Sequence, residues 1–195
     1  VNMPSGESLV RQAVTGQRWL GERLGVRATT CWLADCWGLP RSLPGLLRHS
    51  GYTRLMFWRG KPPWLTVSEF RWRGLDDSEL LCHWTPLGYR AASRNDAFAR
   101  SGAASDAPDP ARLMAGIHAA IEGVVAFATT PHMLVSLGGP LAPTMETTAR
   151  VIEALNRATT GAYRFLWSTP SRFFDAVEAS GADLPVVDGE FNPVC

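Results

Sequence analysis

The sequence of 195 residues is short of lysine, of net charge and of long hydrophobic runs. Lys61 is its only lysine, and 19 basic residues stand against 18 acidic ones, which leaves a formal charge of +1. A chain this close to neutrality offers no electrostatic basis for binding nucleic acid or an anionic membrane surface, so we expect neither partner. The longest apolar candidate, residues 117–128, is interrupted by His118 and Glu122. It is too short for the ~20 residues of a membrane span.

Paired cysteine motifs are also missing, since the four cysteines show no C-x-x-C spacing: Cys31, Cys36, Cys82 and Cys195. Such scattered cysteines are typical of reduced thiols, and they favour a cytoplasmic location over a disulfide framework. The chain opens at Val1 without an initiator methionine and without a basic-then-apolar leader. We therefore expect it to be an internal piece of a longer protein.

What the sequence does contain is the pattern of an α/β protein, because 46% of its residues are hydrophobic and helical and strand periods alternate. A helix is predicted from Ser5 as cap to Leu24, with Gly25 ending it. A strand over 27–33, a short helix over 43–49 and a strand over 52–58 follow. Strand, helix and strand in this order predict a βαβ unit with a parallel sheet.

The middle of the chain has a different character. Strands over 70–72 and 80–84, joined by the turn-rich residues 74–78, predict a β-hairpin. Residues 89–110 lack apolar periodicity and are interpreted as a long surface excursion. The remaining predictions are a helix over 110–127, a strand over 133–137, a helix over 144–158, a strand over 163–167 and a helix over 170–179. Together they predict an α/β barrel or open sheet that binds ligands at the carboxyl ends of its strands.

Asp35 is the most informative residue, because it follows an otherwise apolar strand and is flanked by Trp32 and Trp37. A carboxylate there can act as metal ligand, nucleophile or base, or it can simply cap the next helix. Arg59 ends the next strand and is expected at the same edge of the sheet. A guanidinium beside a carboxylate favours the ionised form that a nucleophile or ligand needs, although a structural ion pair is the alternative.

Two other kinds of site have weaker support. Cys31, Cys36, His49 and His83 could be combined into a zinc site, but the spacing of the cysteines is irregular for structural zinc. Aromatic and arginine side chains alternate from Trp58 to Tyr89. This mixture could stack on bases or sugars, but strand aromatics are more often core, and no phosphate-binding loop accompanies them.

Several motifs together resemble the family 38 glycoside hydrolases, the retaining α-mannosidases. They are residues 3–12, 16–18, 32–38, 43–44, 57–60, 69–74 and 87–89, with 168–174 and 189–191 near the end. Residues 57–60, 69–74 and 87–89 look most like the bacterial branch that includes mannosylglycerate hydrolases. The resemblance implies one catalytic domain, present in part over 1–195. Residues 1–90 match best, 91–132 are a divergent excursion and helix, and 133–195 form a βαβα end.

By this resemblance, Asp35 is the catalytic nucleophile and a ligand of a single zinc ion. Trp37 lies against the bound sugar, and Arg59 and Tyr89 contact the substrate, which is an α-mannoside. The implied mechanism passes through a covalent glycosyl-Asp35 intermediate. The implied fold is a β/α barrel-like domain with an inserted hairpin.

The sequence departs from the family pattern in two respects. The acid/base aspartate is expected in the loop 138–143, yet no Asp or Glu occurs from Ser136 to Met145. The other zinc ligands are expected outside this chain, so the chain alone should be inactive. An incomplete barrel would also expose strand edges, which is compatible with a homo-oligomer. The alternative is a catalytically degenerate relative that keeps a sugar-binding or scaffold role.

Overall fold

The computed structural model describes residues 2–89, 110–136, 152–153, 155–157 and 163–192. Five strands form one sheet in the order β1-β2-β4-β3-β5. Their bounds are Thr30–Leu33 for β1, Arg54–Phe57 for β2, Glu69–Arg73 for β3, Glu79–Trp84 for β4 and Val186–Asp188 for β5. In the described part of the chain this is an open, mostly parallel sheet, and the expected partial barrel is not confirmed.

The strand directions fix where ligands can approach. β1 pairs with β2 in parallel and β2 pairs with β4 in parallel, so the carboxyl ends of these three strands lie at one edge. The βαβ prediction is therefore confirmed. β3 runs antiparallel to β4, which confirms the hairpin, and β5 adds to the outer side of β3 in parallel.

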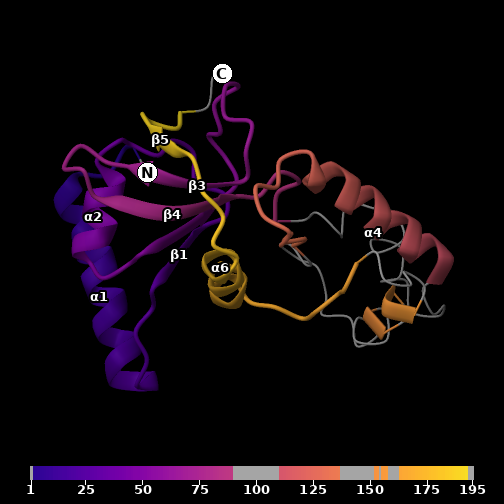
Figure 1. Ribbon diagram of the computed structural model, residues 1–195. Coiled ribbons are helices and arrows are strands. Elements are labelled where there is room, and N and C mark those ends of the chain that lie inside the picture. Colours follow the sequence, from indigo (N-terminus) through magenta and orange to yellow (C-terminus); the bar gives the residue numbers. More distant parts are fainter. Residues whose placement is uncertain (1, 90–109, 137–151, 154, 158–162, 193–195) are drawn as a thin grey trace.

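The two faces of the sheet are covered by different elements. On one face, α2 (Leu43–His49) packs its leucines over alternate residues of β2, β3 and β4, among them Phe57, Phe70 and Trp72. On the other face, α6 (Pro170–Ala179) packs Phe173, Phe174 and Val177 against Met56 and Leu81. Figure 1 shows α1 and α2 together on one side of the molecule and α4 on the other.

Helix ends match the sequence signals. α1 (Gly6–Leu24) begins after Ser5, whose hydroxyl accepts a hydrogen bond from the Ser8 amide, and ends at Gly25 in the left-handed conformation. Thr169 caps α6 in the same way, through the Arg172 amide. The ends of α1 were predicted from capping chemistry, and α6 begins at the predicted residue 170. None of the helices in the described ranges combines the length and apolar character that crossing a membrane requires.

Two strand predictions in the last third are wrong. Residues 133–136 and 163–167 carry no ladder hydrogen bonds, whereas residue 137 lies outside the described residues. Their apolar side chains instead pack on α4 (Pro110–Val125) around Ile117 and Ile121. The Asn156 side chain donates to the Phe165 carbonyl at 2.9 Å and accepts from its amide at 2.8 Å, so a side chain takes the place of a partner strand. The excursion 90–109 and most of the helix predicted over 144–158 lie outside the described residues.

Candidate active site

The four residues predicted for the site come together at the carboxyl edge of the sheet. Asp35 and Trp37 lie in the loop after β1, Arg59 follows β2, and Tyr89 follows β4. Because β1, β2 and β4 are adjacent and parallel, the three loops are neighbours.

Asp35 is held through both of its carboxylate oxygens. The Arg59 Nε–H donates to Oδ1 in a short ion pair, and the Tyr89 hydroxyl donates to Oδ2 over 3.5 Å. The Asp35 side chain is still 49% exposed and the Arg59 side chain 29% exposed. The carboxylate is thus oriented by two partners and remains open to a ligand, with its Oδ2 only weakly engaged.

The Arg59 guanidinium lies against two indole rings. Its central carbon is 3.9 Å from the centre of the Trp58 ring and 4.4 Å from that of Trp37. Such cation–π contacts fix a planar guanidinium more firmly than a single ion pair does. The Trp37 ring is 54% exposed, so it also offers a flat apolar surface beside Asp35.

Trp58 was not predicted as a site residue, and the structure shows what places it there. Its carbonyl accepts a hydrogen bond from the Trp84 indole at 2.9 Å, and its ring meets the Tyr89 ring edge to face at 5.2 Å. Gly88, at a φ of 73°, comes so close that a Cβ there would lie 2.6 Å from the Trp58 ring. In the sequence, Trp58 opens the run of alternating aromatic and arginine side chains and lies in the motif 57–60, and Gly88 stands just before Tyr89.

A second carboxylate, that of Glu69, is buried within the sheet and paired with His83. Glu69 and His83 are 1% and 0% exposed, and His83 Nδ1 lies 2.8 Å from Glu69 Oε1. The other carboxylate oxygen accepts from the Thr129 amide at 2.9 Å and from its hydroxyl at 3.0 Å. Burial by itself raises the pKa of the Glu69 carboxyl, but the hydrogen bonds from His83, Thr129 and Ser68 and the His83 charge outweigh it, so that pKa lies below its usual value.

The cysteines near the site are free thiols, as predicted for Cys31, Cys36 and Cys82. Burial raises the pKa of the Cys31 thiol to about 12, with Cys36 adding a smaller effect. A thiol with that pKa is protonated at neutral pH and is a poor nucleophile. Cys31 is therefore not a nucleophile candidate, whereas Asp35 in the following loop is half exposed.

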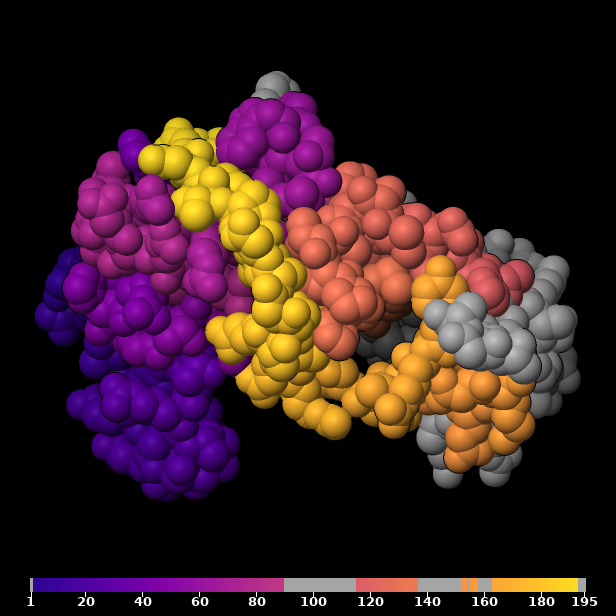
Figure 2. Space-filling view, viewed as in Figure 1, coloured from indigo at the N-terminus to yellow at the C-terminus, as the bar shows by residue number. Residues whose placement is uncertain are grey.

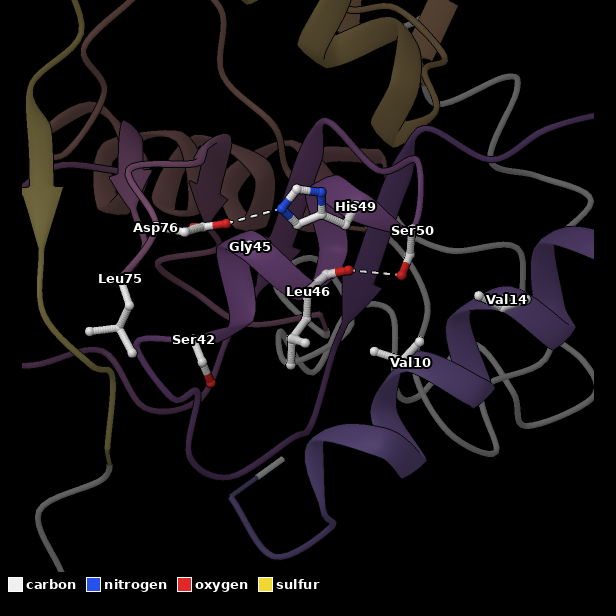
Figure 3. Close-up of a pocket in the computed structure, with 9 residues that line it drawn as sticks. All are labelled: Val10, Val14, Ser42, Gly45, Leu46, His49, Ser50, Leu75 and Asp76. Carbon is white, nitrogen blue, oxygen red and sulfur yellow. Dashed lines mark hydrogen bonds and ion pairs between the residues drawn. The ribbon is translucent and has the colours of Figure 1, made fainter.

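One cavity lies elsewhere, between α1, α2 and the turn that joins β3 to β4. Its volume is about 300 Å³, and Figure 3 shows Val10 and Val14 of α1 facing α2 across it. His49 Nε2 and Asp76 Oδ2, 3.1 Å apart, are joined at its edge. The cavity contains none of the four predicted site residues.

Among the described residues, Asp35 does not belong to a cluster of three or more potential metal ligands. No group of three His, Cys, Asp or Glu side chains converges anywhere in the described ranges. His49 and His83, which might have joined a cysteine site, instead pair with Asp76 and Glu69. The described residues therefore do not fit a zinc ion on their own. The loop 138–143, expected to carry the acid, lies outside the described residues.

Fold and site together define an α/β domain with an oriented carboxylate at the ends of parallel strands. The model of the N-terminal domain of family 38 glycosyl hydrolases matches residues 1–190, so the chain belongs to that family. It is 39% identical to the α-mannosidase of Saccharomyces cerevisiae and 36% identical to human α-mannosidase 2C1, in each case over 90 residues. These matches cover 44% of this chain and 8% of each relative.

A solved structure supports the fold. The chain matches an α-mannosidase from Enterococcus faecalis with a TM-score of 0.81 at 21% identity, over 96% of this chain and 20% of that one. The homologues are thus glycosidases of the α-mannosidase type, and this chain spans a small part of their length.

Proposed function

We propose that this chain carries the nucleophile of an α-mannosidase active site, and that Asp35 attacks the anomeric carbon of an α-mannoside. One observation carries the proposal: a half-exposed carboxylate at the ends of three parallel strands is oriented by Arg59 and Tyr89 beside an exposed indole. Membership of family 38 and the α-mannosidase homologues supply the substrate class.

The proposed first step forms one bond and breaks another. Asp35 Oδ2, the oxygen with the longer contact, bonds to the anomeric carbon while the bond from that carbon to the leaving oxygen breaks with its electron pair. Arg59 keeps Oδ1 in place, and Trp37 offers its face to the sugar ring. Water then attacks the same carbon and loses a proton to the solvent while the bond from Asp35 Oδ2 to that carbon breaks, which restores the carboxylate and releases mannose with retained configuration.

The leaving oxygen must acquire a proton. In the family pattern an aspartate in the loop 138–143 supplies it, and this chain departs from that pattern. The loop expected to supply it has no Asp or Glu from Ser136 to Met145. Losing a general acid costs roughly 10²–10⁴-fold for a poor leaving group and little for a good one. We therefore propose that the protein hydrolyses activated α-mannosides far better than alkyl α-mannosides.

We further propose that the site is completed by residues outside this chain. The resemblance assigns Asp35 to a zinc site, but the described residues form no group of three or more potential ligands around it. A tetrahedral zinc site needs four ligands, and we propose that the remaining ones, with strands that continue the sheet beyond β1, lie outside the described residues. It follows that the 195-residue chain alone is inactive.

The test is hydrolysis of dinitrophenyl α-mannoside, with zinc added, by the protein in its full natural reading frame. Asp35→Asn should lower kcat/KM on the order of 10⁴-fold or more. The matched control is Asp175→Asn, since Asp175 is an exposed aspartate on α6 that also pairs with an arginine, Arg54 of β2. A 2-fluoro mannoside with a good leaving group should add one glycosyl unit to the wild-type protein. Peptide mapping should place that unit on Asp35.

Equal activity of wild type and Asp35→Asn would contradict the nucleophile assignment. Absence of turnover and of labelling, in a folded wild-type protein, would instead favour a second candidate: a degenerate relative that binds sugar through Trp37, Arg59 and Tyr89. The acid-free loop is the observation that favours this candidate. Mannose titration followed by tryptophan fluorescence would then detect binding.

A further inference from the structure

The last described residues form a strap across the site loops, defined here as residues 186–192. It begins as β5, which pairs with β3, and then turns at Gly189. Beyond the turn, Phe191 pairs its backbone with Leu39, as its amide donates to the Leu39 carbonyl at 2.9 Å and its carbonyl accepts from the Leu39 amide at 2.8 Å. Leu39 is two residues beyond Trp37, in the loop that also carries Asp35.

The Phe191 side chain anchors the strap in the core. It is 0% exposed and lies nearly parallel to Trp72 at 4.4 Å and to Phe57 at 5.3 Å between ring centres. The Trp72 indole also donates to the Gly189 carbonyl at 2.8 Å. Phe57 ends β2 directly before Trp58 and Arg59, so the anchor packs at the base of the second site loop.

The strap also touches the second loop through its backbone. Gly60, which follows Arg59, has a φ of 87°, and a Cβ there would lie 2.7 Å from the Phe191 carbonyl oxygen. The Phe191 carbonyl thus accepts a hydrogen bond from Leu39 in the first site loop and lies close to Gly60 in the second. Figure 2 shows the C-terminal segment, in yellow, running over the part of the molecule built from the first ninety residues.

We propose that Phe191 is a positioning residue for the Asp35–Arg59 pair. Asp35 and Arg59 sit on separate loops, and their contact depends on the distance between those loops. Phe191 ties both loops to one rigid aromatic cluster and so sets that distance. It touches no substrate itself and acts through Leu39, Phe57 and Gly60.

The test reads the site loops directly. The chain is labelled with 5-fluorotryptophan and observed by fluorine NMR. The Trp37 resonance is assigned as the one that is lost in Trp37→Phe. The Trp58 resonance is assigned in the same way from Trp58→Phe. Phe191→Leu should shift or broaden both resonances. The matched control is Phe174→Leu, because Phe174 is equally buried but belongs to α6 and packs on the opposite face of the sheet. The control should leave both resonances in place, although it removes the same ring.

A second variant covers the case in which Phe191→Leu does not fold. Trp72→Phe keeps an aromatic ring under Phe191 but removes the hydrogen bond to Gly189, and it should move the Trp37 resonance by a smaller amount. The proposal is overturned if folded Phe191→Leu leaves Trp37 and Trp58 unmoved. It is also overturned if Phe174→Leu moves them equally, because the effect would then be general loosening of the core.

An activity measurement, which rests on the proposed function, adds a second readout. In the full reading frame, Phe191→Leu should lower kcat on the order of 10²-fold with little change in KM, as expected when a nucleophile is displaced by about 1 Å. Phe174→Leu should keep both. If the wild-type protein has no mannosidase activity, the proposed function fails, while the fluorine resonances still decide the role of Phe191.

Discussion

Two carboxylates of the chain, each paired with a basic side chain, have opposite surroundings. Asp35–Arg59 is about half exposed at the strand ends, whereas Glu69–His83 lies between strands with almost no exposed surface. Every oxygen of the Glu69 carboxylate is bound by protein, while Asp35 Oδ2 has one long contact. A carboxylate that is fully satisfied stabilises the fold, and one that is oriented but left open is available for chemistry.

The buried pair should be the more costly of the two to break. His83→Leu leaves the Glu69 carboxylate buried without its partner, and we expect a loss of about 3–5 kcal/mol in the free energy of unfolding. The control is Arg73→Leu, which breaks the exposed Arg73–Glu79 pair of the same hairpin and should cost no more than about 1 kcal/mol. Urea unfolding of both variants measures the difference. Equal losses would remove the contrast between buried and exposed pairs.

The buried pair should also make the fold sensitive to acid. The folded-state pKa of Glu69 lies below its ordinary value of 4.5, so the unfolded chain takes up the proton first as pH falls. Its contribution is fully present above pH 4.5 and is lost as pH falls through the lower folded pKa. Urea midpoints of wild type and Glu69→Gln should therefore differ most at neutral pH and converge in acid. A constant difference across that range would contradict this assignment.

A smaller loss of stability is expected at Gly88, which packs against the Trp58 ring that in turn contacts Arg59. Gly88→Ala places a methyl group against the Trp58 ring, at a φ that favours glycine, and should cost about 1–3 kcal/mol. Gly25→Ala is the matched control, since Gly25 has a similar φ of 65° but no atom within 4 Å of an added Cβ. The additional loss in the free energy of unfolding at Gly88, relative to Gly25, measures the cost of the steric contact with the Trp58 ring. Equal losses would mean that backbone strain alone matters.

The fold was predictable where signals are local. Ser5 and Gly25 mark both ends of α1, and Thr169 marks the start of α6, because caps depend on the neighbouring residues only. β5 gave no such signal, since a three-residue strand has no period of its own and exists because β3 offers a partner. Residues 133–136 show the converse, as apolar residues without a strand partner pack on a helix instead.

The site was predictable in part for the same reason. Parallel strands bring their carboxyl ends to one edge, which was enough to expect Asp35 beside Arg59. That Trp58 would lie on the guanidinium rather than in the core depends on the approach of Gly88, from the loop after β4. The Phe191 anchor depends on a pairing across 152 residues with Leu39. Contacts of this kind have no signature in a single sequence.

The smallest effect on stability is expected for Asp35→Asn, and it distinguishes the Asp35–Arg59 pair most clearly from the buried Glu69–His83 pair. Asp35→Asn keeps the size of the side chain and one acceptor oxygen for Arg59, and the Asp35 side chain is 49% exposed. Exposed ion pairs contribute little, so the free energy of unfolding should change by no more than about 0.5 kcal/mol. Urea unfolding measures this directly, beside the loss of turnover expected for the same variant. A loss above about 2 kcal/mol would mean that Asp35 is a structural partner of Arg59, as the exposed pair would then resemble the buried one. Unchanged stability with lost turnover would mean that the fold does not need this carboxylate and that the reaction does.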